Sequence, residues 1–442
     1  KGKRMKVYFN TLGCPKNIND SEIAMGNLEE KGFTIVESPD EADAIIVNTC
    51  GFIEDAKKES IDEIFNMAAY KEKNKKLVIS GCLVQRYADE LYKEIPEANG
   101  FIGVNDYDKL PKLLEELEKS NERFLENSSC DLSEVEVKIR HLTENPYTSY
   151  LKIAEGCDNI CSYCIIPEIR GPYRSRTIEN VIEEAEMLSK SGCKELILIA
   201  QDLTYYGIDN YGKPMLSTLL RKLCKIEGIE WIRLLYCYEE RIDDELIRTI
   251  ASEDKICNYI DIPIQHASDK ILDNMNRATT NKSLYRTLSK LRSQIPDIHI
   301  RTTLIVGFPG ETEEDFNILS DFVSDQKFSR LGVFTYSREE GTAAATMDNQ
   351  IPEDIKQERL DCIMMKQMEI SLEGNRKKIG KILDVIVDSM EEEGVYSGRT
   401  RYDAPEIDNS VVFTSNSVHK PGDIVPVEIL EAYDYDLEGR EV

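Results

Sequence analysis

The sequence predicts an α/β protein of several domains: an N-terminal open parallel α/β sheet, a central partial (βα)6 barrel of the TIM type, and a small C-terminal antiparallel β-barrel. A chain of 442 residues has room for about three domains. Short apolar runs alternate with helix-like segments along most of it, as in parallel sheets. The final segment changes to strand-like alternation with glycine turns. We therefore expect domains at residues 5–120, 146–372 and 373–442, with a polar linker at 121–145.

The N-terminal domain is predicted from apolar runs that are followed by amphipathic segments. The expected strands are Lys6–Leu12, Phe33–Val36, Ala44–Thr49 and Lys76–Ser80. The expected helices are Ser21–Lys31, Ala56–Tyr70 and Gln85–Ile95. Strand–helix repeats of this kind form a mostly parallel sheet, because each helix carries the chain back across one face.

Six further strand–helix units predict the central barrel, two units short of a closed eight-stranded one. Its expected strands are Tyr150–Ala154, Glu195–Ala200, Trp231–Tyr236, Tyr259–Ile264, His299–Val306 and Leu331–Tyr336. Its expected helices are Ile178–Ser191, Met215–Cys224, Asp243–Ser252, Ser283–Gln294 and Glu313–Asp325, with a polar helical stretch over 351–379. The strands expected in the last domain are Ile382–Val387, Gly394–Arg399, Val411–Phe413 and Val425–Leu430.

Composition narrows the class of protein. The formal net charge of −27 argues against a general affinity for nucleic acid or anionic lipid, because both are polyanions. No apolar run approaches the roughly 18 residues of a membrane span, and the stretch Val7–Thr11 is too short for a signal peptide. We therefore expect a cytoplasmic protein. In a reducing compartment, twelve cysteines indicate metal binding or catalysis rather than disulfides.

The strongest motif is the run Cys157, Cys161 and Cys164, with the spacing C-x3-C-x2-C directly after the first barrel strand. The loops that follow barrel strands form the catalytic face of such a fold. Three thiolates can hold a 4Fe–4S cluster and leave one iron open. Zinc is the alternative, but no fourth Cys or His lies within about 25 residues downstream, as a zinc site would require.

A second set of cysteines is far apart in sequence. Cys14, Cys50 and Cys82 each follow an apolar strand candidate directly. Because parallel strands end at the same edge of a sheet, the three thiols should converge there, and the glycines beside them allow close backbone approach. We expect a second cluster with one open iron. For the other six cysteines a structural role is the default: Cys130, Cys193, Cys224, Cys237, Cys257 and Cys362.

Together with Tyr163 before its last Cys, the spacing C-x3-C-x-aromatic-C resembles the radical S-adenosylmethionine (SAM) superfamily. The resemblance implies that the open iron binds SAM and that a 5′-deoxyadenosyl radical is formed. It places Tyr163 beside the adenine, and the segment from Thr303 to Glu311 is similar to the superfamily's adenine-contacting motif. Polar residues near other strand ends should line the same pocket. The expected cofactor-binding residues are Tyr163, Gln201, Arg233, Gln265, Thr303, Ile305, Gly307 and Glu311.

Nearly the whole chain resembles the radical SAM methylthiotransferases, which have a three-Cys domain before the radical barrel and a TRAM β-barrel after it. The resemblance implies two 4Fe–4S clusters, SAM as methyl donor and radical source, and a flavodoxin or ferredoxin as electron donor. We nominate no catalytic acid or base, because radical chemistry at carbon needs none. A non-enzymatic iron–sulfur electron carrier remains a distant alternative.

The choice of substrate depends on two features. The segments Thr11–Asn17 and Gly398–Asp408 resemble the branch of the family that modifies the β-carbon of an aspartate in small-subunit ribosomal protein S12. Members that act on tRNA adenosine usually have Gln after the first cysteine, where this chain has Pro15. From Glu373 onward 16 acidic and 8 basic residues give −8, which suits a basic protein rather than tRNA as the TRAM ligand. A tRNA substrate remains the alternative.

Overall fold

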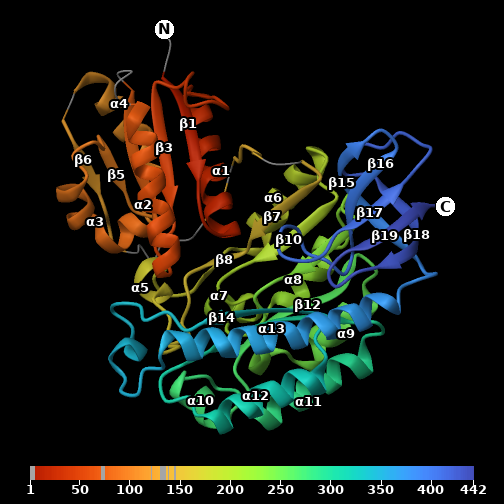
Figure 1. Ribbon diagram of the computed structural model, residues 1–442. Helices are drawn as coiled ribbons and strands as arrows, with labels where there is room; N and C mark the ends of the chain where they lie inside the picture. The colour runs from red at the N-terminus through yellow and green to blue at the C-terminus, as the bar shows by residue number, and fades with distance from the viewer. Residues whose placement is uncertain (1–4, 71–74, 121, 130–135, 138, 144–145) are drawn as a thin grey trace.

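The computed structural model describes residues 5–70, 75–120, 122–129, 136–137, 139–143 and 146–442. In chain order it has a parallel α/β sheet, a larger parallel sheet covered by helices, and a small β-barrel (Figure 1). Within the described ranges, no helix is long and apolar enough to cross a membrane. This architecture confirms the predicted fold class.

The N-terminal sheet has the strand order β2-β1-β3-β4-β5-β6, with every pairing parallel. Apolar clusters pack on both of its faces, and all six residues of β3 are buried. Its strands are β1 Lys6–Thr11, β2 Thr34–Ile35, β3 Ala44–Thr49, β4 Lys76–Gly81, β5 Gly100–Ile102 and β6 Phe124–Glu126. Its helices are α1 Pro15–Glu30, α2 Glu54–Ala68, α3 Cys82–Glu94 and α4 Leu110–Lys119.

Helix α1 begins six residues earlier than its amphipathic pattern predicts. Pro15 occupies the first helical position, where its missing N–H costs nothing. The first two turns are polar yet buried, including Asn19, Asp20 and Glu22, because they pack against the central domain rather than against the helix's own sheet. The Asn19 side-chain amide, for example, donates to the Tyr150 carbonyl of the central sheet at 3.2 Å. A buried polar face of this kind gives no amphipathic signal.

The central sheet has the order β14-β13-β12-β11-β10-β7, and each pairing is parallel. Its six strands confirm the predicted partial barrel, and its main apolar core lies between sheet and helices. The strands are β7 Thr148–Lys152, β10 Glu195–Ile199, β11 Trp231–Leu234, β12 Ile256–Gln265, β13 His299–Val306 and β14 Arg330–Thr335, with a small β8 Ala154–Glu155 and β9 Arg174–Ser175 pair beside them. The helices are α5 Ile166–Arg170, α6 Ile178–Lys190, α7 Ile208–Tyr211, α8 Leu216–Leu223, α9 Asp244–Ser252, α10 Asp269–Asn274, α11 Asn281–Gln294, α12 Glu313–Gln326 and α13 Glu353–Arg376.

The C-terminal strands close into a five-stranded barrel in the order β15-β16-β17-β19-β18. They are β15 Ile382–Glu392, β16 Val395–Thr400, β17 Val411–Thr414, β18 Ile424–Ala432 and β19 Leu437–Glu441. The pairing differs from the prediction in one place: β17 and β19 are parallel, whereas the other four pairs are antiparallel. The parallel pair closes the barrel with β19, a strand that the sequence pattern did not reveal.

The C-terminal barrel packs against one end of the central barrel. An apolar cluster joins Ile386 and Ala404 of the small barrel to the lumen residues Tyr150 and Tyr259. Helix α13 connects the two domains without a break, and the predicted boundary at 372/373 falls inside it. The domain limits therefore stay predictions, whereas the contact between the domains is a described feature.

Buried ion pairs hold this contact. The Arg330 guanidinium donates to the Asp403 carboxylate, and Arg399 donates to Glu195 at 2.9 Å. Burial alone would raise the pKa of Asp403, but Arg330 and Lys378 hold it below the ordinary value. Charges removed from water are stable only when paired.

We expect Asp403→Ala to loosen the docking of the C-terminal barrel, because it leaves the buried Arg330 without its carboxylate. The local free energy of opening should fall by about 3 kcal/mol, measured by hydrogen exchange of β15 and β18. The control is Glu393→Ala, at an exposed position of the same barrel. Equal exchange in both variants would contradict the expectation.

Candidate functional site

Three cysteines of the N-terminal domain stand at one edge of its sheet. Cys14 follows β1, Cys50 follows β3, and Cys82 follows β4 as the first residue of α3. These strands are parallel neighbours, so their carboxyl ends meet. Burial raises the pKa of Cys50 to about 12, and the nearby thiols of Cys82 and Cys14 add to the effect. The structure thus brings together the three residues that the sequence predicts as one ligand set.

Glycine is required next to these thiols. Gly13 has φ +92°, a left-handed conformation that side chains disfavour. A Cβ at Gly13 would stand 2.8 Å from the Cβ and 3.3 Å from the Sγ of Cys50. Gly81, with φ +99°, is equally crowded by Asn48 and Thr49. The cysteine edge is therefore packed so tightly that one methyl group would displace a thiol.

The second set of thiols lies on the loop between β8 and α5. The Cys164 N–H donates to the Cys161 carbonyl at 3.1 Å, which closes a tight turn. Burial raises the pKa of Cys157 to about 11 and that of Cys164 to about 12. An amide and a guanidinium face two of these sulfurs. The Asn159 amide donates to Cys157 Sγ at 3.4 Å, and Arg277 Nη1 lies 3.9 Å from Cys161 Sγ.

Neither thiol set is arranged around a single metal ion in the described part of the chain. Within the described ranges, no three His, Cys, Asp or Glu side chains converge closely enough to bind one metal ion together. A zinc ion needs all its ligand atoms about 2.0–2.3 Å from one centre, whereas each cysteine of a 4Fe–4S cluster binds a different iron. The zinc alternative therefore has no support in this part of the chain.

Tyr163 and Ile305 lie in one apolar cluster beside the cysteine loop. The cluster includes the buried residues Met275, Phe308 and Tyr336. It joins the loop to the carboxyl end of β13, so an apolar surface lines the space next to Cys161 and Cys164. A flat aromatic ligand could lie against such a surface, as expected for Tyr163.

Gly307 and Glu311 have a different environment from the expected one. The Gly307 N–H donates to the Glu311 carboxylate at 2.9 Å, and Arg359 of α13 pairs with the same carboxylate at 2.7 Å. A Cβ at Gly307 would stand 2.2 Å from Cγ of Lys356. The close approach at this glycine is thus made by α13, and Glu311 holds the turn rather than facing open space.

The remaining residues expected to bind the cofactor fall into two groups. The Gln201 side-chain amide donates to the Glu155 carboxylate at 2.8 Å. Gln265 lies at the end of β12, and its side-chain amide is 3.5 Å from the Pro263 carbonyl. The Thr303 hydroxyl accepts a hydrogen bond from Arg301 at 3.3 Å. These three residues therefore lie either beside the loop that carries Cys157, Cys161 and Cys164 or inside the central barrel.

Arg233 lies elsewhere. Its guanidinium is fully buried and pairs with Glu195 at 2.8 Å, and it donates to the Arg401 and Thr400 carbonyls of the C-terminal barrel at 3.0 and 3.4 Å. These contacts fix the end of the central barrel that faces the small domain. We leave Arg233 out of the proposed cofactor site.

A buried charge network that sequence reasoning missed connects the two cysteine sets. Arg170 donates from Nη2 to Cys82 Sγ at 3.3 Å and to Asn17 at 2.9 Å, and from Nη1 to Asp20 at 2.6 Å. It also contacts Glu155, two residues before Cys157. The only sequence signal for this network was the presence of charged residues beside the cysteines and glycines.

Lys152 completes this network. Its ammonium pairs with Asp20 and with Glu155, the latter at 2.7 Å. Burial alone would raise the pKa of Glu155, but Lys152 and Arg170 outweigh it and hold the pKa well below the ordinary value. The network therefore links helix α1, through buried charges, to the loop that carries Cys157, Cys161 and Cys164. This loop between β8 and α5 is called the radical loop below.

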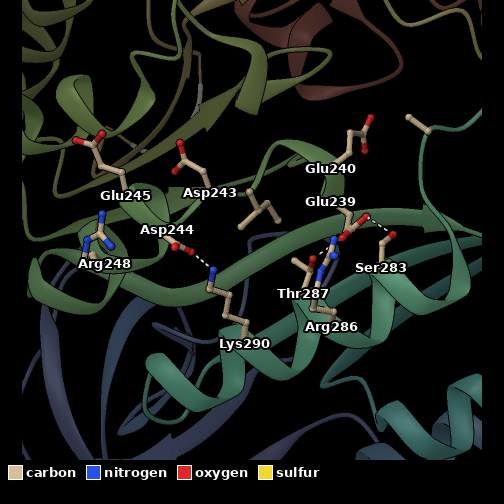
Figure 2. Close-up of a pocket in the computed structure, with 12 residues that line it drawn as sticks. Glu239, Glu240, Asp243, Asp244, Glu245, Arg248, Ser283, Arg286, Thr287 and Lys290 are labelled. Carbon is tan, nitrogen blue, oxygen red and sulfur yellow. Dashed lines mark hydrogen bonds and ion pairs between the residues drawn. The ribbon is translucent and has the colours of Figure 1, made fainter.

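A surface pocket of about 670 Å³ lies between α9 and α11 (Figure 2). Its walls carry Glu239, Asp244, Thr287 and Lys290. Lys290 pairs with Asp244 and Thr287 donates to Glu239 across it. The pair of Lys290 and Asp244 thus neutralises two of the charges that line the pocket.

The other cysteines behave as expected where they are described. Cys193 and Cys237 belong to the main core of the central domain and Cys257 to the lumen cluster. Cys224 and Cys362 are half-buried and pack against the main core. Cys130 lies outside the described residues.

The fold and the cysteine loop together define a radical SAM protein with an added N-terminal domain and a TRAM barrel. Residues 151–323 match the Radical SAM superfamily, residues 379–442 match the TRAM domain, and residues 6–103 match "Uncharacterized protein family UPF0004". An iron–sulfur cluster and SAM are the cofactors of this superfamily.

Similar curated proteins span the whole chain. The ribosomal protein uS12 methylthiotransferase RimO of Acetivibrio thermocellus is 50% identical over 447 residues, covering 99% of each chain. The protein of the same name from Clostridioides difficile is 49% identical, covering 98% of each. The chain therefore belongs to the RimO family of radical SAM methylthiotransferases.

A solved structure shares the fold. The radical SAM methyltransferase TsrM from Kitasatospora setae superposes with a TM-score of 0.58 at 12% identity, covering 83% of this chain and 89% of that one. At this identity the likeness shows the arrangement of the sheets alone.

We expect Gly13→Ala to destabilise the N-terminal domain by about 2–4 kcal/mol, from the left-handed backbone and the contact with Cys50. Urea unfolding of the protein, followed by near-ultraviolet circular dichroism, measures the change. Gly374→Ala, in an uncrowded turn of α13, is the matched control and should stabilise slightly. A Gly13→Ala protein as stable as the wild type would show that the cysteine edge is loosely packed.

Proposed function

We propose that this protein transfers a methylthio group to the β-carbon of an aspartate in ribosomal protein uS12. The observation that carries the proposal is the junction of two cysteine triads, joined by the Arg170 network, in a chain that resembles uS12 methylthiotransferases over nearly its full length. Two triads suit this reaction, because removing a hydrogen and delivering sulfur are separate tasks.

The proposed cofactors are two 4Fe–4S clusters and SAM. Cys157, Cys161 and Cys164 would hold one cluster, and Cys14, Cys50 and Cys82 the other, each with one open iron. When bound, the first cluster with SAM supplies the radical that removes hydrogen from the substrate carbon, and the second supplies a site for sulfur. Burial raises the pKa of Cys50 and that of Cys164 to about 12, so metal binding at each of these two thiols must displace a proton.

Side chains around the radical loop would orient SAM and the cluster. Asn159 and Arg277 donate toward two of the sulfurs and so hold the side chains of Cys157 and Cys161 in place. Asp202 holds Asn159 at 3.0 Å and Arg241 at 2.8 Å, so the loop is fixed from outside as well. The cofactor-facing residues that we propose are Tyr163, Gln201, Gln265, Thr303 and Ile305, with Gly307 and Glu311 shaping the turn behind them.

The acidic C-terminal barrel is proposed to contact basic uS12, but through fewer residues than its composition indicates. Asp388, Asp403 and Asp408 face arginines within the protein. The family-specific segment 398–408 thus packs against the central barrel. The exposed carboxylates that remain for a basic partner are those of Asp384, Glu391, Glu392, Glu393, Glu406, Glu431, Asp436 and Glu438. A flavodoxin or ferredoxin donor and a cytoplasmic location complete the proposal.

The activity test uses anaerobically reconstituted protein with SAM, dithionite and sulfide, and offers purified uS12 beside bulk tRNA. Replacement of H by SCH3 adds about 46 mass units, as the atomic masses require, and mass spectrometry should find it on an aspartate of uS12. Modification of tRNA alone would overturn the substrate, and absence of 5′-deoxyadenosine would overturn the radical chemistry.

Metal analysis tests the two cluster sites separately. The wild type should bind about eight irons, and replacing Cys14, Cys50 and Cys82 together by Ala should leave about four. Replacing Cys193, a core cysteine outside both triads, by Ala should leave the iron content unchanged. Stoichiometric zinc in the reconstituted wild type, or unchanged iron in the triple variant, would contradict the assignment.

A further inference from the structure

Lys16 is a buried lysine without a carboxylate partner. It lies in the first turn of α1, two residues after Cys14, and is 8% exposed. Its Nζ stands 3.6 Å from the centre of the Tyr236 ring. Among the described residues, no carboxylate lies within ion-pair distance of it, although burying an amino group is costly unless an anion pairs with it.

The acidic groups nearest to Lys16 are already paired with other residues. The Asp261 carboxylate accepts from Arg301 at 2.9 Å and from the Tyr236 N–H at 3.0 Å. Glu155 pairs with Lys152 and Arg170. These two carboxylates are thus paired without Lys16, and the other anionic group beside it is the thiol of Cys14, so Lys16 has no carboxylate of its own.

Lys16 also lies between the two cysteine sets. It belongs to the helix that starts at Cys14, and the ring beneath it belongs to the segment that follows β11. Two residues further along that segment, the Tyr238 ring packs 4.3 Å from the guanidinium of Arg277, which faces Cys161. Lys16 therefore stands on the side of the N-terminal cysteine set that faces the central barrel and its cysteine loop.

We propose that Lys16 is a specificity residue that pairs with the side-chain carboxylate of the target aspartate. This inference rests on the proposed function and names the group that recognises its substrate. An ion pair at the carboxylate would hold the adjacent β-carbon between the two triads. The base of an adenosine carries no carboxylate, so the same lysine would disfavour a tRNA substrate.

A double-mutant cycle in binding tests the pairing. The Kd of the reconstituted holoenzyme is measured for wild type and Lys16→Met, each with uS12 and with uS12 whose target aspartate is Asn. Each single change should raise the Kd about tenfold or more. With both changes together, the further rise over either one should be less than about threefold, because a lost partner cannot be lost twice.

Two measurements keep the outcomes distinct. Iron analysis of Lys16→Met is the first, and it should find both clusters. The second is the Kd of Lys31→Met, at the exposed end of the same helix, which controls for the loss of a lysine. Effects on Kd that multiply, or no effect of Lys16→Met, would overturn the inference and assign Lys16 to balancing cluster charge. A wild type that binds uS12 but transfers no methylthio group would overturn the proposed function itself.

Discussion

The buried guanidinium of Arg170 sets how the N-terminal domain sits on the central barrel. It contacts Asp20 from α1, Glu155 from the strand before the radical loop, and the sulfur of Cys82. Any other orientation of the two domains would separate the Asp20 carboxylate from Arg170 and Lys152 and leave it unpaired in a dry interface, at a cost of several kcal/mol. The network thus adds orientation more than stability. Because its members neighbour the cysteines in sequence, the relative placement of the two triads follows from the same contacts.

The central barrel has two ends with different tasks. At the carboxyl ends of its strands it carries the radical loop, the apolar cluster around Tyr163 and the N-terminal domain. At the other end Arg233, Glu195 and Arg399 form a chain of alternating charges that anchors the small barrel. The arginines and carboxylates that look, by composition, like an interaction surface are thus largely used within the molecule. The partners of a surface are therefore indicated by the positions of its unpaired charges rather than by composition alone.

Much of the fold could be predicted because strands and most helices carry local patterns. Both cysteine sets were predictable too: one from its spacing, the other because thiols that follow parallel strands must meet at one sheet edge. What escaped prediction depends on contacts between distant segments. The start of α1 was hidden because its buried face is polar. The surroundings of Arg170 and Lys16 could not be read from local patterns, because Arg170 contacts Asp20 and Lys16 contacts Tyr236 across the domain interface. Arg233 lies near a strand end, but its side chain donates to backbone carbonyls of the C-terminal barrel, which are more than 160 residues further along the chain.

The small barrel also covers one end of the central barrel. Its residues Ile386 and Ala404 complete the apolar cluster inside the lumen, and Asp408 reaches Arg301 within it. A chain cut before β15 would expose the aromatic and aliphatic side chains of this cluster to water and leave the buried Arg330 without its carboxylate. An apolar surface uncovered in this way favours self-association. Loss of this domain would therefore show itself first as aggregation of the truncated protein, and not only as weaker capture of the substrate.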